Sequence, residues 1–475
     1  MSFEALSSED NGGLRHVCRI AFPMVLSTSS ATVMGFVDRM FLSWHDPKEM
    51  AAALASGLTY WTLISLFIGT TSYTSTFVAQ YFGSNEHRRI PAAVWQGVFF
   101  ALASGLLMML TGVFAGQLMG IAGHPEELHR LETTYYRILA FGAIGAVVSS
   151  ALSGFYGGLG KTRIMMVVEI AGNVVNALLD YCMIFGKWGF PEWGIAGAAI
   201  ATVISGFLIA CTYVVLLFLG PLGRAYRVMT LPQLDRPLLW RLIRYGLPNG
   251  LGWTVDAAGW TGFVWLVGRL GEVPMQALSA AFAINHLAFF PMIGFSAATS
   301  IIVGQFIGAA SPRLARRATY NAFAITTAWM TLIAAVFVLF PRELLSFFAP
   351  RQNPSSFADA ASTAVVLLRF VALYSIFDSG NLIFSAALKG AGDTRFVFFM
   401  IVALSLVILI IPVYASVEIL GLGVYASMSF ATAYVIVLAL AYYLRFLAGK
   451  WESMRVIETP LPPAQRHAEG PIVEP

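Results

Sequence analysis

The sequence predicts an all-helical integral membrane protein with twelve transmembrane helices in two bundles of six. Three observations predict this fold class: an apolar composition, apolar runs of membrane-spanning length, and an internal repeat. The 475 residues are 58% hydrophobic and 11% charged, whereas soluble domains carry about 25% charged residues. A water-soluble globule cannot hide so much apolar surface, so lipid is the expected solvent for most of the chain.

The apolar runs recur along the chain, and each one is long enough to cross a membrane. A hydrocarbon core of about 30 Å needs roughly 20 residues of helix, whereas a barrel strand needs only about 10 alternating residues. Short loops with Gly, Pro and charged residues separate the runs, which therefore predict helices. The expected spans are residues 17–43, 50–80, 91–118, 132–158, 162–186, 194–220, 240–268, 275–308, 317–340, 363–388, 395–415 and 421–446.

The Lys and Arg residues predict the orientation. With twelve spans both termini lie on one side, and that side receives 20 of the 29 Lys and Arg residues while the opposite side receives 7. By the positive-inside rule we expect both termini in the cytoplasm. The first span carries Asp38 and Arg39 and leads into further spans, so we expect it to be retained and not cleaved as a signal peptide.

The chain repeats itself at a shift of about 225 residues. Residues 78–83 (VAQYFG) match residues 303–308 (VGQFIG), and residues 158–163 (GLGKTR) resemble residues 390–395 (GAGDTR). Several matches in the same order predict two similar halves of six spans each. Halves with an even number of spans share one orientation, so their symmetry axis is expected along the membrane normal.

The repeat divides the chain into two lobes joined by a linker. We expect an N-lobe at residues 1–220, a basic cytoplasmic linker at residues 221–239 and a C-lobe at residues 240–455. The remaining residues, 456–475, are rich in proline and carry mixed charge, which predicts a disordered cytoplasmic tail.

Polar residues within the apolar runs are the candidate functional residues of the first half. An ionisable group at the bilayer centre costs about 2.5–3.5 kcal/mol on insertion scales, so it faces protein or water. Asp38 lies near the end of the first span, and Glu169, Asn173, Asn176 and Asp180 follow helical spacing in the fifth. This spacing places the four on one helix face and predicts a hydrophilic cavity wall or cation site. The alternative is a hydrogen-bonded seam between helices.

The second half carries its own polar residues inside expected spans. Asp256 lies in the seventh span, Asn285 and His286 in the eighth, and Asp378 in the tenth. A carboxylate in such a place can bind Na⁺ through oxygen, or take up a proton once burial favours the neutral form. A hydrogen bond to a neighbouring Ser or Tyr is the structural alternative. His286 can add pH sensitivity or be a satisfied interior histidine.

Other classes of function lack their sequence signals. The chain has no GxxxxGK[ST] motif for ATP, no HExxH and no GxSxG, and His286 has no evident catalytic partner. We therefore expect a protein that is not an enzyme, needs no cofactor beyond Na⁺ or H⁺ as coupling ion, and binds no nucleic acid. Buried single acids and a lobed repeat favour a transporter over a channel.

Several short segments resemble the multidrug and toxic compound extrusion (MATE) family of the MOP superfamily. The resemblance covers residues 15 to about 450 and rests on the segments together, since none is specific alone. The matching segments are residues 36–38 (FVD), 160–163 (GKTR), 176–180 (NALLD), 197–202 (GAAIAT), 246–248 (GLP), 303–305 (VGQ) and 390–394 (GAGDT).

The resemblance implies two six-helix lobes around a central cleft that opens to either side in turn. It also implies cation-coupling or proton-coupling residues, with Na⁺ possible at Asp38, Asn176 and Asp180 or at Asp256 and Asp378. The coupling residues of the C-lobe are implied by a resemblance of the second half to the NorM-type branch of the family. In that branch the acid of the seventh helix is commonly Glu, where this chain has the shorter Asp256. The implied coupling residues are Asp38, Asn176, Asp180, Thr202, Asp256, Tyr374 and Asp378.

The function implied is secondary active efflux of cationic amphipathic drugs or toxins in exchange for Na⁺ or H⁺. The resemblance further implies a multi-pass protein of the bacterial inner (plasma) membrane, for which a monomer suffices. The alternative within the superfamily is a flippase of a lipid-linked oligosaccharide. That activity predicts a strongly cationic cavity for phosphate, whereas the charges expected inside these spans are mainly acidic.

Overall fold

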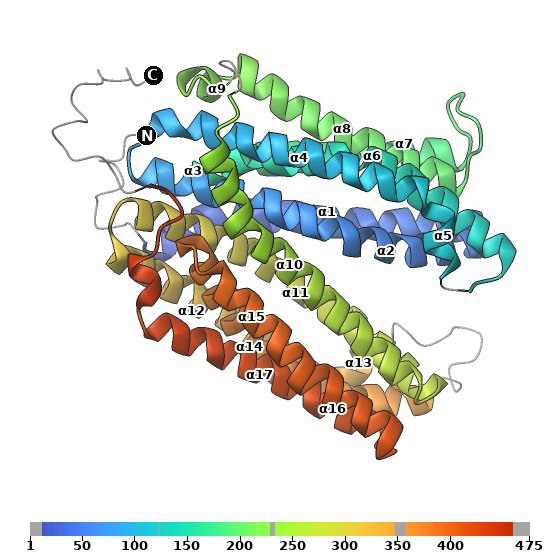
Figure 1. Cartoon of the computed structure of the whole chain (residues 1–475). Helices are drawn as coiled ribbons and strands as arrows, with labels where there is room; N and C mark the ends of the chain where they lie inside the picture. The colour runs from blue at the N-terminus through green and yellow to red at the C-terminus, as the bar shows by residue number, and fades with distance from the viewer. Residues whose placement is uncertain (1–11, 122, 229–232, 347–357, 459–475) are drawn as a thin grey trace, which may run out of the picture.

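The computed structural model describes residues 12–121, 123–228, 233–346 and 358–458. Within these residues the chain forms helices and connecting turns, with no strand (Figure 1). The helices of the first half are α1 (Leu14–His45), α2 (Pro47–Ser72), α3 (Thr74–Gly83), α4 (Ile90–Val113), α5 (Ala115–Gly120), α6 (Glu126–Gly158), α7 (Thr162–Ile184), α8 (Ile195–Leu219) and α9 (Pro221–Ala225). The α-helices of the second half are α10 (Arg236–Gly268), α11 (Glu272–Gly308), α12 (Pro312–Leu339), α13 (Pro341–Ser346), α14 (Ala358–Ala391), α15 (Thr394–Leu404), α16 (Ile411–Tyr414) and α17 (Val424–Leu447).

Each expected span corresponds to a long helix or to a run of short ones, so the predicted all-helical membrane fold is confirmed. Eleven helical stretches of the described residues are long and apolar enough to cross a membrane. The exception is α10, which at 33 residues is long enough but carries Asn249, Asp256 and several glycines. A seventh span that is apolar only in part is consistent with the twelve-helix architecture.

The helices pack into two bundles that meet along a few central helices. In the first bundle α6 packs against α2, α4 and α8, while in the second α14 packs against α11, α12 and α17. The bundles contact each other through α1 with α11, α2 with α10 and α3 with α11. Figure 1 shows the start of α1 and the end of α17 at the same end of the molecule, where the two bundles converge.

The two halves of the sequence repeat face each other across this contact. A methyl group on Gly83 would overlap the carbonyl oxygen of Gln305, and one on Gly308 would overlap that of Gln80. The side-chain amide of Gln80 donates to the carbonyl of Gly390 at 3.0 Å, and that of Gln305 donates to the carbonyl of Gly158 at 2.8 Å. Each lobe thus reaches the glycine motif of the other, and we call these two bonds the glutamine clasp.

Removing either glutamine of the clasp is expected to lower the melting temperature. Gln80 and Gln305 are buried, so Gln80→Leu or Gln305→Leu leaves a buried carbonyl without a donor, at a cost of about 1–3 kcal/mol. Gln276→Leu is the matched control, because Gln276 is exposed and bonded only to Glu272 of its own helix. Thermal unfolding in detergent checks this, and equal melting temperatures for all three variants would contradict it.

The chain end after α17 returns to the first bundle. Trp451 is fully buried and stacks on Phe446 with ring centres 4.7 Å apart. Beyond it the backbone N–H of Val456 donates to the Oε1 atom of Gln80 at 2.9 Å, and Ile457 joins the hydrophobic core of the first bundle. We call residues 454–458 the C-terminal strap.

The last residue of the strap joins both bundles. The Glu458 carboxylate accepts a hydrogen bond of 2.6 Å from the Tyr81 hydroxyl of α3 and pairs with Arg241 of α10 at 2.7 Å. These contacts correct one expectation, because Val456, Ile457 and Glu458 are packed although the tail was predicted to begin at 456. The rest of the predicted tail, residues 459–475, lies outside the described residues.

The strap contact is expected to weaken in acid. Partial burial raises the pKa of Glu458, but the hydrogen bonds from Tyr81 and Arg241 outweigh it and hold the pKa below its ordinary 4.5. A carboxylate whose pKa is lower in the folded state stabilises the fold above pH 4.5 and loses that effect as the pH falls further. Glu458→Gln should therefore cost up to about 1 kcal/mol at neutral pH and little in acid.

Melting temperatures across this pH range check the prediction for the strap. Glu127→Gln is the control, since Glu127 forms an exposed ion pair with Lys48. The Glu127 side chain is 70% exposed and that of Lys48 is 60% exposed. The prediction is wrong if Glu458→Gln and wild type lose stability in parallel as the pH falls.

Candidate functional site

The first candidate site lies where α1 packs against α7. Asp180 is fully buried, and its Oδ2 atom accepts a hydrogen bond of 3.1 Å from the side chain of Asn176 one turn earlier. The charge of Asp38 on α1 acts on Asp180, so the two carboxyl groups are neighbours. Within the described residues, the Oδ1 atoms of Asp38 and Asp180 are buried and accept no hydrogen bond. Each therefore offers an oxygen to a proton or a cation.

The polar face predicted on the fifth span divides between two neighbouring helices. Asn173 donates to the hydroxyl of Ser30 at 3.0 Å and so faces α1, together with Asn176 and Asp180. Glu169 instead accepts from the hydroxyl of Tyr213 on α8 at 3.1 Å. The hydroxyl of Thr202 is bonded within α8, to the Ala198 carbonyl at 3.0 Å. These three hydrogen bonds all lie within the first bundle.

The second candidate site lies among α10, α14 and α17. Asp256 of α10 accepts a hydrogen bond of 3.2 Å from the hydroxyl of Tyr434 on α17. The charge of Lys389, near the end of α14, also acts on Asp256. Asp256 therefore has a hydrogen-bond donor and a nearby positive charge, whereas Asp38 and Asp180 keep oxygens without a donor.

Asp378 and Tyr374 occupy one region of α14, opposite α11. Asp378 is buried and accepts from Asn381 at 2.9 Å, and its charge interacts with that of Asp256. The amide of Asn285 on α11 donates to the Tyr374 hydroxyl at 3.2 Å. The structure thus brings together four predicted residues from three helices: Asp256, Asn285, Tyr374 and Asp378.

His286 lies apart from this cluster. The residue is exposed, and its ring stacks on Phe290 with ring centres 6.1 Å apart. The charge of Arg39 on α1 acts on it.

Several residues of these sites were not predicted from the sequence. Trp260 has its ring next to those of Tyr374 and Tyr434, at 6.5 and 6.1 Å, and so forms one wall of the second site. Asn381 follows Asp378 by three residues, and this helical spacing could have identified it. Tyr434 and Lys389 gave no local signal, because their proximity to Asp256 depends on how α10, α14 and α17 pack.

Both sites contain carboxylates that can bind a proton or a monovalent cation. Among the described residues, no three His, Cys, Asp or Glu side chains cluster as ligands of a metal ion. Two acids with a neighbouring amide, as in Asp38, Asn176 and Asp180, offer oxygen ligands of the kind that hard cations prefer. The same pair of buried like charges can share one proton.

The comparison with known families fits the two-lobed arrangement. Residues 23–182 and 261–415, one segment in each bundle and together more than half of the chain, match the family model MatE. The chain belongs to the MatE family. The predicted family is thereby confirmed, and a MatE protein is a membrane transporter and not an enzyme.

Relatives and solved structures agree with this assignment. The chain is 29% identical over 378 residues to a probable multidrug resistance protein NorM of Burkholderia mallei, covering 79% of this chain and 80% of the relative. It is 23% identical to a protein of the same name from Thermotoga maritima, over 93% of this chain and 94% of the relative.

Two solved transporters of the MOP superfamily share the fold of this MatE chain. One is a multidrug resistance MATE transporter in an outward-facing conformation, with a TM-score of 0.84 at 21% identity over 93% of this chain and 97% of that one. The other, from Pyrococcus furiosus, is described as having a binding pocket of reverse polarity, with a TM-score of 0.85 at 20% identity and the same coverage.

Proposed function

We propose that this MatE transporter is an antiporter that exports cationic amphipathic compounds in exchange for inward-moving Na⁺ or H⁺. The observation that carries the proposal is the pair of neighbouring acids in each lobe, Asp38 with Asp180 and Asp256 with Asp378, of which Asp180 and Asp378 are buried. The relatives named as multidrug resistance proteins support export of small-molecule drugs. Each inward-moving charge gains about 2.3 kcal/mol per 100 mV of membrane potential.

The N-lobe pair is the better candidate for the coupling ion. Asp38 and Asp180 keep buried oxygens without a donor, while Asp256 is bonded to Tyr434 and lies near the charge of Lys389. An ion that binds Asp38 and Asp180 removes their mutual repulsion and lets α1 pack more closely on α7. Since α1 also contacts α11, this change reaches the other lobe and can lower the affinity for a cationic drug.

The two lobes would move as units about their contact. The glutamine clasp and the strap close the end that carries the termini, and the excess of Lys and Arg predicts that this end is cytoplasmic. The described state would then be closed to the cytoplasm, in a bacterial plasma membrane, with residues 1–220 and 240–455 as the two lobes. A single chain contains both proposed sites, so a monomer suffices.

Arg39 favours the runner-up function, a flippase of a lipid-linked oligosaccharide. It lies on α1 beside Asp38, and its charge reaches His286 of the opposite lobe. A cation between the lobes suits a phosphate-bearing substrate. The two acid pairs nevertheless favour a cationic substrate over a phosphate-bearing one. The experiment below tests the antiporter against the flippase.

Transport of a cationic dye by purified protein tests the proposal. Proteoliposomes loaded with ethidium receive a Na⁺ gradient or a pH gradient, and dye movement is followed for wild type, Asp38→Asn and Asp378→Asn. We expect movement under one gradient and its loss in Asp38→Asn. Movement under neither gradient would overturn the antiporter and shift the weight to the flippase.

A further inference from the structure

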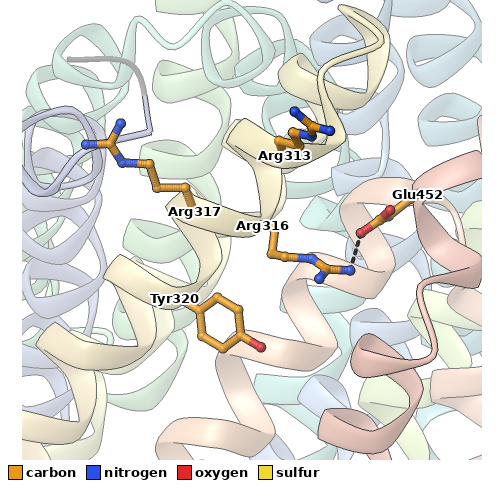
Figure 2. Close-up of a pocket in the computed structure, with 5 residues that line it drawn as sticks. All are labelled: Arg313, Arg316, Arg317, Tyr320 and Glu452. Carbon is orange, nitrogen blue, oxygen red and sulfur yellow. Dashed lines mark hydrogen bonds and ion pairs between the residues drawn. The ribbon is translucent and has the colours of Figure 1, made fainter. Parts of the chain in front are cut away.

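A pocket at the terminus-bearing end of the second bundle has no part in the proposed transport cycle. It has a volume of about 400 Å³ and lies between the first turns of α12 and the short helix Lys450–Ser453 that follows α17. Figure 2 shows its lining. The lining residues are Arg313, Arg316, Arg317, Tyr320 and Glu452.

The charge of the pocket is predominantly positive. Three of the five lining side chains are arginines, and Glu452 is the one acid among them. Arg316 forms an ion pair with Glu452, with 44% and 31% of the two side chains exposed. Figure 2 shows the guanidinium groups of Arg313 and Arg316 on the side of Glu452, whereas that of Arg317 points the other way. The dashed line in Figure 2 joins Glu452 to Arg316 and not to Arg313.

One lining residue of the pocket, Tyr320, is aromatic. The ring of Tyr320 packs against Phe446 and Phe384, with ring centres 5.7 and 6.2 Å apart. Beyond Tyr320, α12 continues as an apolar helix of membrane-spanning length. A ligand in the pocket would therefore have cations at one end and apolar surface at the other, which is the pattern that an anionic amphiphile needs.

We propose that this arginine pocket binds the phosphate group of an acidic phospholipid from the adjoining membrane leaflet. Guanidinium groups bind phosphate oxygens through paired N–H donors, and a phosphodiester in the pocket could accept from Arg313 and Arg316 together, whereas the Glu452 carboxylate pairs with Arg316. The first turn of α12 adds the partial positive charge of a helix N-terminus. Basic pockets between membrane helices on the cytoplasmic side are where such headgroups bind.

The proposal gives Glu452 a defined role. A phosphate at Arg316 has to displace the Glu452 carboxylate, since both anions use the same guanidinium group. Removing that carboxylate should therefore strengthen lipid binding, whereas removing the arginines should weaken it. The opposite signs separate a binding site from a surface that is merely basic, because loss of an acid from such a surface changes affinity little.

Lipid binding to the full-length chain in a neutral detergent tests the proposal. Native mass spectrometry with phosphatidylglycerol is expected to show a bound lipid whose affinity falls about tenfold or more in the variant Arg313→Gln with Arg316→Gln. Glu452→Gln should raise the affinity a few-fold. Arg269→Gln is the matched control, because Arg269 forms a similar exposed pair with Glu418 at 2.8 Å, at the opposite end of the protein. It should bind as wild type does.

Two further arms identify the source of the phosphate. Phosphatidylcholine, with a phosphate but no net charge, should bind at least tenfold more weakly, and inorganic phosphate at the same concentration should not displace phosphatidylglycerol. If inorganic phosphate displaces it fully, the phosphate site stands and the lipid as its occupant is overturned. If the double arginine variant binds phosphatidylglycerol as wild type does, the site itself is overturned. Neither result bears on dye export, so the lipid site is tested independently of the proposed antiport.

Discussion

Asp180→Asn is expected to reduce gradient-driven dye export to the background of protein-free liposomes. Asp180 is fully buried and next to Asp38, and each keeps one buried oxygen without a donor. An asparagine has neither the negative charge that attracts Na⁺ nor an oxygen that takes up a proton. The same loss is expected for Asp38→Asn. The measurement is ethidium movement under the gradient that drives the wild type.

The inactive variant is expected to be at least as stable as wild type. The side-chain oxygen of an asparagine can still accept the hydrogen bond that Asn176 donates at 3.1 Å. The substitution also removes one of two like charges held close together away from water, and their repulsion opposes folding. An equal or higher melting temperature beside lost transport would therefore assign the defect to coupling and not to the fold.

Glu169→Gln is the matched control on the same helix. Glu169 is bonded to Tyr213 of α8, about three helical turns from Asp180, and a glutamine oxygen can accept the same hydrogen bond. It should retain export. Asp256→Asn and Asp378→Asn complete the series, and a partial effect there would assign the C-lobe acids to the drug. If all four Asp→Asn variants export as wild type does, carboxylate coupling is wrong.

The sequence was sufficient to predict the number and place of the membrane helices, because length and apolarity decide them locally. It was less informative where one expected span is divided into two helices, or where a span carries polar residues. The expected span 50–80 is two helices, α2 and α3, that meet at Tyr73. The seventh span was placed correctly although α10 lacks an apolar window, because loops with charged residues bound it on both sides.

The candidate sites were predictable only along each helix. Asn176 and Asp180 lie four residues apart, so their hydrogen bond follows from helix geometry alone. Glu169 and Asp180 lie on nearly the same side of the helix, since eleven residues make about three full turns, yet Glu169 meets α8 while Asn173 meets α1. Which neighbouring helix each residue reaches therefore depends on how α1 and α8 lie against α7. Contacts such as Tyr434 with Asp256 join residues 178 positions apart, and only the packing of the helices determines them.

Gly83→Ala and Gly308→Ala are expected to open the terminus-bearing end of the transporter. In each case the new methyl group would overlap a backbone carbonyl of the opposite lobe, that of Gln305 or that of Gln80. A backbone carbonyl cannot move aside as a flexible side chain can, so α3 and α11 have to separate. Overpacking of this kind costs about 1–3 kcal/mol, and here the separation also stretches the glutamine clasp.

Gly35→Ala separates this effect from the general effect of a glycine in a helix. Gly35 lies within α1, and a methyl group there would meet nothing within 4 Å. Alanine in place of a helical glycine stabilises by roughly 0.5–1 kcal/mol when space is available. Gly35→Ala should therefore melt at or above the wild-type temperature, while Gly83→Ala and Gly308→Ala should melt below it.

A thiol probe reports where the lobes separate. Ala79 is fully buried beside Gly304 of the opposite lobe, so a cysteine at this position should react slowly in the closed state. The background replaces the native Cys18, Cys182 and Cys211. Labelling of Ala79→Cys should accelerate when Gly83→Ala or Gly308→Ala is added, and stay slow with Gly35→Ala. Slow labelling in all three combined variants, together with melting temperatures equal to one another, would mean that the lobes accommodate the methyl groups. Close glycine packing would then not keep this end closed.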